Sequence, residues 1–331
     1  MSNMNVETTI GIDISKESFD VAILREDSYD LGEFANEEGG FRKLGKWLQK
    51  RGLGGSQVCL EATGRYGQAL AIYLHEAGYE VSVVNPSRIK AYGESQLKRN
   101  KTDREDAKVI AHFCRTQKPA VWTPPSAAVL ELQMLVRRLD SVKGMRTQER
   151  NRRQAGQTSK AVLADIEAHI AYLDEQIQGL EAQIEELIAS HPNLKRQREL
   201  LVSIKGISET TAAKFLAEVP DVQQFETAAQ LAAYAGVTPR QKNSGSSVRG
   251  KGHLSKMGNS RLRTAFYMPA ISAMRWNPLI IPLVERLEKR GKLPKVIIGA
   301  VMRKLIHLVF GVLKSGKPFD PNYLQNQQVG I

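Results

Sequence analysis

The chain has 331 residues, of which 42% are hydrophobic and 25% charged. These proportions are typical of globular proteins and exclude a generally disordered chain, and the length predicts two or three domains. Lys and Arg outnumber Asp and Glu by 47 to 35, which gives a net charge of +12. Such an excess of positive charge favours a polyanionic partner.

Cysteine content and the N-terminus indicate the cellular compartment. The only cysteines, Cys59 and Cys114, exclude a disulfide framework or a cysteine zinc site, and we expect both to be reduced core residues. The N-terminal "MSNMNVETTIGIDIS" lacks the basic and apolar parts of a signal peptide. We expect no apolar run to approach the length that spans a bilayer. We therefore expect no membrane association, and a cytoplasmic, nucleoid-associated protein of a prokaryote.

The first part of the chain alternates short β-like runs with helical ones. "TTIGIDISKESFDVAIL" predicts two strands joined by a turn, "EEGGFRKLGKWLQKRG" a helix, and "SQVCLEATG" a buried strand. "YGQALAIYLHEAGYEVSVVNP" predicts a helix that stops at Gly78, then another strand. Strands that alternate with helices are typical of an α/β sheet domain.

A heptad seam follows the proline-bearing stretch "KPAVWTPPSAA". Its apolar residues recur at alternating spacings of three and four: Leu163, Ile166, Ile170, Leu173, Ile177, Leu180, Ile184 and Leu187. Isoleucine at a and leucine at d favours a two-stranded parallel coiled coil between copies of the chain. The alternative is an amphipathic helix that folds against its own domain.

The rest of the chain is predicted to be mainly helical. "LLVSIKGISETTAAKFLAEV" resembles a helix-hairpin-helix, in which Gly206 permits the turn and backbone N–H groups face a DNA phosphate. An ordinary pair of packed helices has a similar pattern, so this alternative stays open.

A basic segment, "NSGSSVRGKGHLSKMGNSRLR", lies in a region without Asp or Glu between Glu226 and Glu285. Taken alone, it is typical of a flexible phosphate-binding loop. His253 is interpreted as a phosphate contact, because no nearby Asp could orient it as a base. The candidate nucleic-acid contacts are Arg240, Lys242, Arg249, Lys251, Arg261 and Arg263.

Four carboxylates in the first part of the chain stand in a suggestive order. Asp13 follows the apolar run "IGI", Glu61 closes "VCL", and Asp103 and Asp106 share a face at a helix start. Each has an ordinary interpretation, as a solvated strand end or as acidic residues that complement a helix dipole. Together, four oxygen donors at one sheet edge suit one or two Mg²⁺ ions in phosphoryl transfer, as in a ribonuclease H-like fold.

"IGIDISKESFDVAIL" also resembles the first phosphate strand of sugar kinases and actin-like ATPases. That fold requires a second, glycine-rich phosphate loop and an adenosine motif in a duplicated domain. The second half of this chain is helical and basic instead, which favours the nuclease-type interpretation.

Over nearly its whole length the chain resembles the DEDD-type transposases of insertion-sequence family one hundred and ten, relatives of the Piv invertase and now known as bridge-RNA-guided serine recombinases. The matching stretches are "GIDISKE", "CLEATGRY", "VSVVNP", "LKRNKTDREDA", "FCR", "LVSIKGISETTA", "FETAAQLAAYAGVTPR", "SGSSVRGKGHLSKMGNSRLR" and "VIIGAVMRKL".

The resemblance implies three domains. Residues 1–120 would form a RuvC-like domain with an acidic tetrad, 121–198 a coiled-coil segment used in oligomer assembly, and 199–331 a serine transposase domain. The implied tetrad, with its Mg²⁺, is Asp13, Glu61, Asp103 and Asp106. The first serine of the S-G-S-S motif, Ser244, would be the nucleophile. The family works as a homo-oligomer, a dimer and then a tetramer in the synaptic complex, with a noncoding RNA that pairs with target and donor DNA.

The sequence therefore predicts an RNA-guided DNA recombinase of an insertion sequence. Its Ser244 would attack a backbone phosphate while the acidic tetrad holds Mg²⁺. The first alternative is a metal-dependent RuvC-like junction nuclease without a covalent intermediate. The second is a basic, oligomeric nucleic-acid-binding protein without enzymatic activity.

Overall fold

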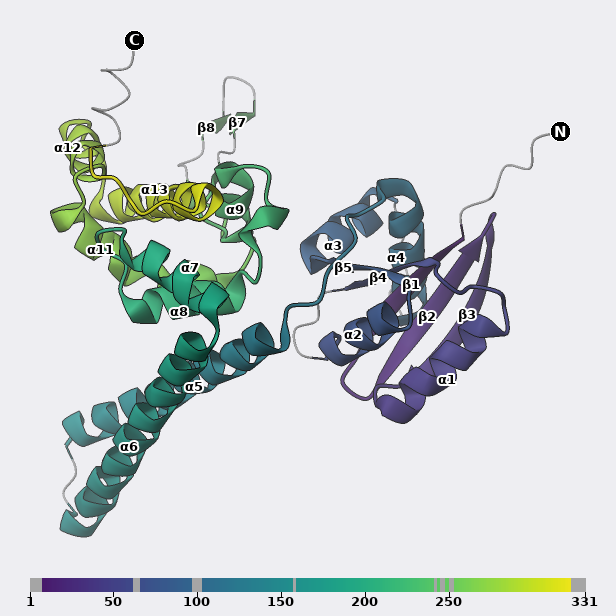
Figure 1. Ribbon diagram of the computed structural model, residues 1–331, viewed down its shortest axis with the longest axis horizontal. Helices are drawn as coiled ribbons and strands as arrows, with labels where there is room; N and C mark the ends of the chain where they lie inside the picture. Colours follow the sequence, from purple (N-terminus) through teal and green to yellow (C-terminus); the bar gives the residue numbers. More distant parts are fainter. Residues whose placement is uncertain are drawn as a thin grey trace. The chain divides into compact units, whose positions relative to one another are not determined.

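The computed structural model describes residues 8–61, 66–96, 103–156, 159–240, 243–244, 248–249 and 253–322, with the backbone alone at 243–244 and 248–249. The chain forms two compact units, which we call the sheet unit, residues 1–124, and the helical unit, residues 125–331. Figure 1 shows the sheet unit in purple and blue and the helical unit in teal to yellow. The division into three domains at residues 120 and 198 stays a prediction.

The sheet unit contains a mixed five-stranded sheet of order β3-β2-β1-β4-β5, with the first three strands antiparallel and β1, β4 and β5 parallel. The strands are β1 Thr9–Ile14, β2 Ser18–Arg25, β3 Ser28–Ala35, β4 Gln57–Glu61 and β5 Glu80–Val84. The helices are α1 Glu38–Gln49, α2 Gln68–Glu76, α3 Pro86–Ser95 and α4 Asp103–Gln117. This arrangement confirms the predicted α/β, ribonuclease H-like fold.

Two elements of the sheet unit escaped prediction. β3 is an edge strand whose side chains are exposed or half-buried, so its apolar signal is weak. The other is α3, which begins at Pro86 directly after the predicted strand, and Asn85 caps this helix by accepting from the Ser87 N–H. Proline suits this first helical position because its missing N–H has no intrahelical partner there.

Helix α4 lies directly on β1 because Gly11 has no side chain. A Cβ at Gly11 would come within 2.2 Å of the Ala111 nitrogen and 2.3 Å of the Ala107 oxygen. The Thr9 hydroxyl on the same strand donates to the Ala111 carbonyl at 3.0 Å. Cys59 on β4 and Cys114 on α4 are free and buried in the same layer, which confirms their assignment to the core.

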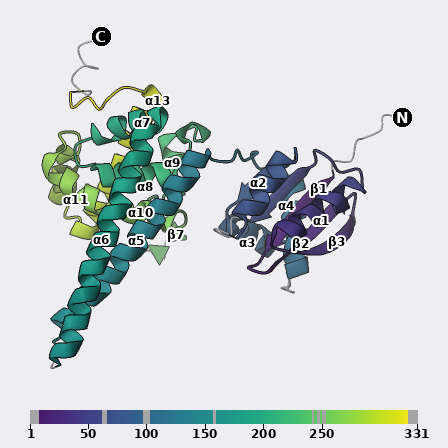
Figure 2. The ribbon, with the colours of Figure 1, turned by 60° about the horizontal axis from the view of Figure 1, so that its bottom comes forward.

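The helical unit begins with a hairpin of two long helices, α5 Ala127–Gln154 and α6 Lys160–Ser190, which run side by side in Figures 1 and 2. They are antiparallel, because Lys143 pairs with Glu181 at 2.6 Å while the later Arg150 pairs with the earlier Asp174 at 3.3 Å.

The hairpin corrects the expectation of a parallel coil between copies. Of the seam on α6, Leu173, Ile177, Ile184 and Leu187 are buried in one cluster with α5. The buried residues of α5 in that cluster have the same spacings of three and four: Val129, Leu132, Val136, Leu139 and Val142. The predicted seam is therefore covered within the chain, as the alternative had it. Assembly of copies through other surfaces stays a prediction.

The remaining elements confirm a mainly helical C-terminal part. The helices are α7 Pro192–Val202, α8 Glu209–Glu218, α9 Ala228–Tyr234, α10 Ser260–Ala265, α11 Tyr267–Trp276, α12 Ile281–Lys289 and α13 Pro294–Ser315, with one 3-10 turn at Val222–Gln224. Two short ladders pair β6 Pro239–Arg240 with β9 His253–Leu254, and β7 Asn243–Ser244 with β8 Val248–Arg249. Gly206 has φ +105° in the turn between α7 and α8, as the hairpin pattern predicts.

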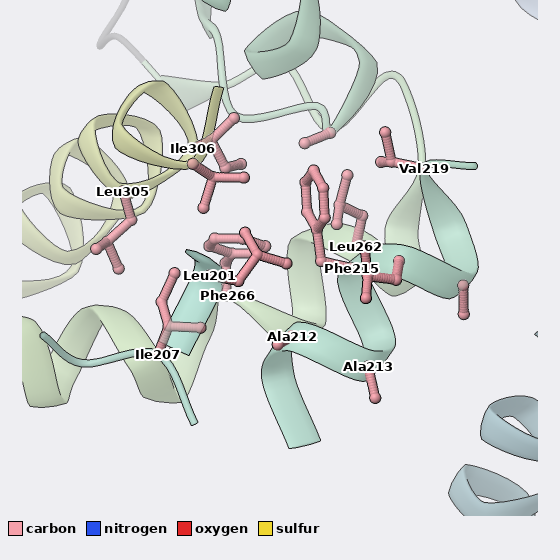
Figure 3. Packing of buried hydrophobic residues seen from close by; sticks show 14 of the residues in the cluster. Leu201, Ile207, Ala212, Ala213, Phe215, Val219, Leu262, Phe266, Leu305 and Ile306 are labelled. Carbon is pink, nitrogen blue, oxygen red and sulfur yellow. The ribbon is translucent and has the colours of Figure 1, made fainter. Parts of the chain in front are cut away.

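Helix α13 corrects a second expectation. By length and composition this helix of 22 residues could cross a membrane, although no such run was expected. Half of its most apolar window is buried inside the helical unit. Leu305 and Ile306 of α13 belong to the same core cluster as Phe215 and Phe266, and Figure 3 shows Ile306 directed toward Phe266. A core helix passes the same test of length and composition.

We expect Gly11→Ala to reduce the free energy of unfolding by about 3 kcal/mol or more, because the added methyl group meets the backbone of α4. Gly144→Ala, in the middle of α5 with open space around it, is the matched control. There alanine should stabilise by up to about 1 kcal/mol through helix propensity. Urea unfolding followed by circular dichroism measures both. Equal stability of the two variants would contradict the close approach.

Candidate active site

The sheet places Asp13 and Glu61 side by side. β1 and β4 are parallel and pair Ile12 with Leu60, so the next residue of each strand, Asp13 and Glu61, lies at the same end of the sheet. Asp103 begins α4, and Asp106 lies one turn later on the same face. Because α4 is fixed on β1 through Gly11, its first turn comes to this end of the sheet as well. The structure thus gathers all four predicted carboxylates.

The pKa of Asp13 reflects its burial and the negative charges around it. Burial, followed by repulsion from Asp106, Glu61 and Asp103, raises the pKa of its carboxyl from 3.8 to about 6, although the backbone N–H of Ile14 works in the opposite direction. A carboxylate that is buried and repelled by neighbours of its own sign is held at an energetic cost that a bound cation would relieve.

The four side chains fit a hard cation by chemistry rather than by their present spacing. All four offer carboxylate oxygens, which are the preferred ligands of Mg²⁺. Among the described residues, however, no group of three or more His, Cys, Asp or Glu side chains is gathered closely enough to hold a metal. The carboxylates therefore interact electrostatically without forming a closed coordination shell.

Asp20 is an acidic neighbour that the sequence prediction missed. It lies directly opposite Asp13 in the ladder between β1 and β2 and is only 9% exposed. Its pKa is raised by burial first and then by Glu33 and Asp103, while Arg104 lowers it. Arg104 lies 3.7 Å from Asp20 and 3.5 Å from Glu33. This cation, between the two predicted aspartates of α4, ties the first turn of that helix to β2 and β3.

We call residues 241–252 the serine-bearing segment, and the structure describes this segment only in part. Ser244 lies in β7, opposite Val248 of β8, and its side chain is outside the described part, as is that of Arg249. Lys242 and Lys251 fall outside the described residues altogether. Contact between Ser244 and these predicted cations therefore remains a prediction.

The three remaining predicted cations differ in their surroundings. Arg240 in β6 and Arg261 on α10 are exposed. Arg263 instead bonds to backbone within the unit, since one guanidinium nitrogen donates to the Lys256 carbonyl at 3.1 Å and lies 3.4 Å from the Ala235 carbonyl. Arg263 therefore braces the chain after the serine-bearing segment.

Both ends of the serine-bearing segment are anchored in the helical unit. β6 and β9 pair, and the Ser255 N–H donates to the Thr238 carbonyl at 2.9 Å. Leu254 packs against the core, where a Cβ on Gly299 of α13 would touch it at 3.4 Å. The chain on either side of residues 241–252 is thus fixed to the helical unit.

A buried carboxylate that the sequence analysis did not single out joins this part of the helical unit to α5. Glu218 is 6% exposed and receives two hydrogen bonds from Arg137 of α5, at 3.0 and 3.2 Å. Asn259 donates to the same carboxylate at 2.8 Å and accepts from the Leu262 N–H at 3.0 Å, which caps α10. We call Arg137, Glu218 and Asn259 the Glu218 junction. The only sequence signal was a single acid at the end of the apolar helix "AAKFLAE".

Together, a ribonuclease H-like sheet with acidic residues at one end and a helical unit with a basic, serine-bearing segment define a DEDD-type enzyme that acts on DNA. Comparison with known proteins gives the same class. A family model described as a transposase matches residues 10–156, and one described as the transposase IS116/IS110/IS902 family matches residues 198–285.

Relatives extend this likeness along the chain. Pilin gene-inverting proteins of Moraxella bovis and Moraxella lacunata are each 34% identical to it, over 95% of this chain and 98% of theirs. A putative transposase of Sinorhizobium fredii is 26% identical over 94% of this chain and 90% of its own. The chain belongs to the IS110 family of DEDD transposases, which confirms the resemblance and excludes a purely binding role.

We expect Asp13→Asn to stabilise the protein in EDTA at pH 7.5 by about 1 kcal/mol, since it removes a charge that burial and like-charged neighbours disfavour and that solvent partly screens. Because folding raises the pKa of Asp13, its unfavourable contribution grows as the pH rises from about 4 to about 6. The gain should therefore be small at pH 4.5.

Thermal unfolding at the two pH values measures this effect. Asp165→Asn, at an exposed position on α6, is the control and should show no such difference between pH values. A gain from Asp13→Asn that is equal at both pH values would contradict the cost of ionising Asp13 as its cause.

For the Glu218 junction we expect Asn259→Ser to reduce stability by about 1 kcal/mol. Serine still caps α10 but is too short to reach Glu218. Combined with Glu218→Gln in a double-mutant cycle, it should show a coupling energy of about 1 kcal/mol, measured by urea unfolding. Thr227→Ser, a conservative change at the cap of α9, is the control. Strict additivity would mean that the two residues do not interact.

Proposed function

We propose that this transposase is a bridge-RNA-guided recombinase that cuts and rejoins DNA through Ser244, with Mg²⁺ at the acidic tetrad. The observation that carries the proposal is the convergence of four carboxylates, three of which add to the effect of burial in raising the pKa of the fourth, Asp13, to about 6. Ser244 is chosen because it is the first serine of the S-G-S-S motif in the family that the chain belongs to.

The proposed reaction is a pair of transesterifications. The Ser244 oxygen attacks the phosphorus of a DNA phosphodiester, so that a P–O bond to serine forms and one P–O bond to the DNA sugar breaks. The serine proton leaves, and the departing sugar oxygen gains a proton and becomes a hydroxyl. A DNA hydroxyl from the partner strand then attacks the phosphoserine, which releases Ser244 and restores a phosphodiester. One phosphodiester is exchanged for another, so the reaction requires no nucleotide cofactor.

The acidic tetrad and the basic segment would divide the electrostatic task. Asp13, Glu61, Asp103 and Asp106 would hold Mg²⁺, which lowers the pKa of an attacking hydroxyl or stabilises a leaving oxygen. Arg240, Arg249 and Arg261 would bind DNA or RNA phosphates through charge-assisted hydrogen bonds. Because the tetrad belongs to the sheet unit and Ser244 to the helical unit, we propose that units of different subunits complete each active site in the oligomer.

The names of the relatives favour recombination over the alternative of a junction nuclease. The Moraxella proteins are described as inverting a pilin gene, and an inversion requires that strands be rejoined as well as cut. A covalent phosphoserine conserves the phosphodiester between these steps, whereas a nuclease would hydrolyse it.

We expect the wild-type protein, incubated with its associated RNA, substrate DNA and Mg²⁺, to form a protein–DNA adduct that survives denaturation. Ser244→Ala should lose the adduct completely, because no other oxygen replaces the nucleophile. Ser246→Ala, two residues away in the same motif, is the matched control and should retain it. Denaturing gel electrophoresis of end-labelled DNA measures the adduct.

Further arms of this experiment separate the alternatives. Cutting that survives Ser244→Ala but not Asp13→Asn would replace the recombinase by a metal-dependent nuclease. Loss of the adduct in EDTA and its return with Mg²⁺ is expected of the tetrad. Equal activity without any copurified or added RNA would overturn the guided part of the proposal.

A further inference from the structure

The two helices that follow the serine-bearing segment carry an exposed face with aromatic residues. α10 and α11 are separated only by Phe266, which is buried together with Ala270 and Ala273. On the other side of α11, Met268 is 67% exposed, and Trp276, the last residue of the helix, is 69% exposed. A tryptophan this exposed is uncommon, because burying an indole normally contributes strongly to stability.

This face is also positively charged. Arg275 precedes Trp276 and is exposed, and it lies seven residues after Met268, hence on the same side of α11. Arg261 is exposed on α10. No Asp or Glu occurs anywhere in residues 227–284, so no acidic residue of this stretch offsets these cations. A patch that combines aromatic surface with cations fits a polyanion that has flat, apolar parts of its own.

The backbone next to Trp276 is held in place by neighbouring elements. Its neighbour Asn277 is fully buried and donates from its side chain to the Lys205 carbonyl at 2.9 Å. Gly206 packs so closely on α11 that a Cβ there would lie 2.9 Å from the Ala273 Cβ. The end of α11 is therefore joined to the turn between α7 and α8, whose exposed Lys205 adds a third cation.

We propose that the end of α11 is a binding site for unpaired DNA, in which a base stacks on Trp276 while Arg275 and Lys205 bind the adjacent phosphates. Stacking requires a free base face, which a duplex hides within its own stack and a single strand exposes. The choice of DNA follows from the family, whose enzymes act on DNA. This site is separate from the proposed chemistry at Ser244 and does not depend on it.

Tryptophan fluorescence tests the stacking directly. The chain has three tryptophans, and Trp276 alone belongs to the helical unit. We expect titration of the full-length protein, in EDTA and at low salt, with a twelve-residue oligothymidine to quench this emission. Trp276→Ala should abolish the quenching and weaken binding by about 5-fold to 100-fold, the usual cost of losing one stacked base. Trp276→Tyr should restore most of the affinity.

The charges and the control have separate readouts. Arg275→Ala should reduce the slope of log affinity against log salt concentration by about 0.7, as expected for one phosphate contact with a single strand. Tyr172→Ala removes another exposed aromatic side chain, on α6, and should change neither quenching nor affinity.

Three results would overturn the proposal. The first is quenching by a duplex as strong as that by the single strand, and the second is quenching by oligouridine but not by oligothymidine. The third is an unchanged emission together with self-association that Trp276→Ala abolishes, which would make this face a contact between copies. Because no strand is cut in EDTA, none of these outcomes depends on whether Ser244 is the nucleophile.

Discussion

The contact of α4 with β1 at Gly11 is the constraint on which the acidic site depends. Two of its carboxylates come from neighbouring strands, and the sheet register alone places them. The other two come from the first turn of a helix far along the chain, and they reach the same end of the sheet only because the helix backbone lies directly against the strand. Gly11, a residue without a side chain, thus determines where the four predicted site carboxylates meet.

The acidic end of the sheet illustrates a conflict between stability and function. A pKa of about 6 at Asp13 means that ionising this carboxyl costs more in the folded protein than in the unfolded chain. Structural ion pairs usually have the opposite effect on a carboxylate. Like charges held together against this cost are typical of sites that bind a cation or carry out chemistry. Arg104, paired with Asp20 and Glu33, holds the first turn of α4 to β2 and β3.

How much the sequence predicts depends on the range of each interaction. Strands, helices and the grouping of Asp13 with Glu61 follow from local periodicity and from the alignment of parallel strands. Asp20 was missed because its relation to Asp13 requires the pairing of β1 with β2, and Glu218 because Arg137 lies 81 residues away. The heptad pattern on α6 correctly predicted that these apolar residues are buried, but it did not identify the helix that covers them. An apolar stripe on a helix indicates that it packs against something, without specifying which helix that is.

The distribution of charge explains why the two units are chemically complementary. The sheet unit concentrates carboxylates at one end of its sheet, where they would repel DNA unless a cation intervened. The helical unit has no acid over residues 227–284, and this stretch includes Ser244 as well as the exposed face of α11. In the proposed reaction the carboxylates of the sheet unit would hold the cation, and the acid-free stretch of the helical unit would bind the phosphate. Under that proposal cutting requires both units, so an enzyme in which they have not come together would leave DNA intact.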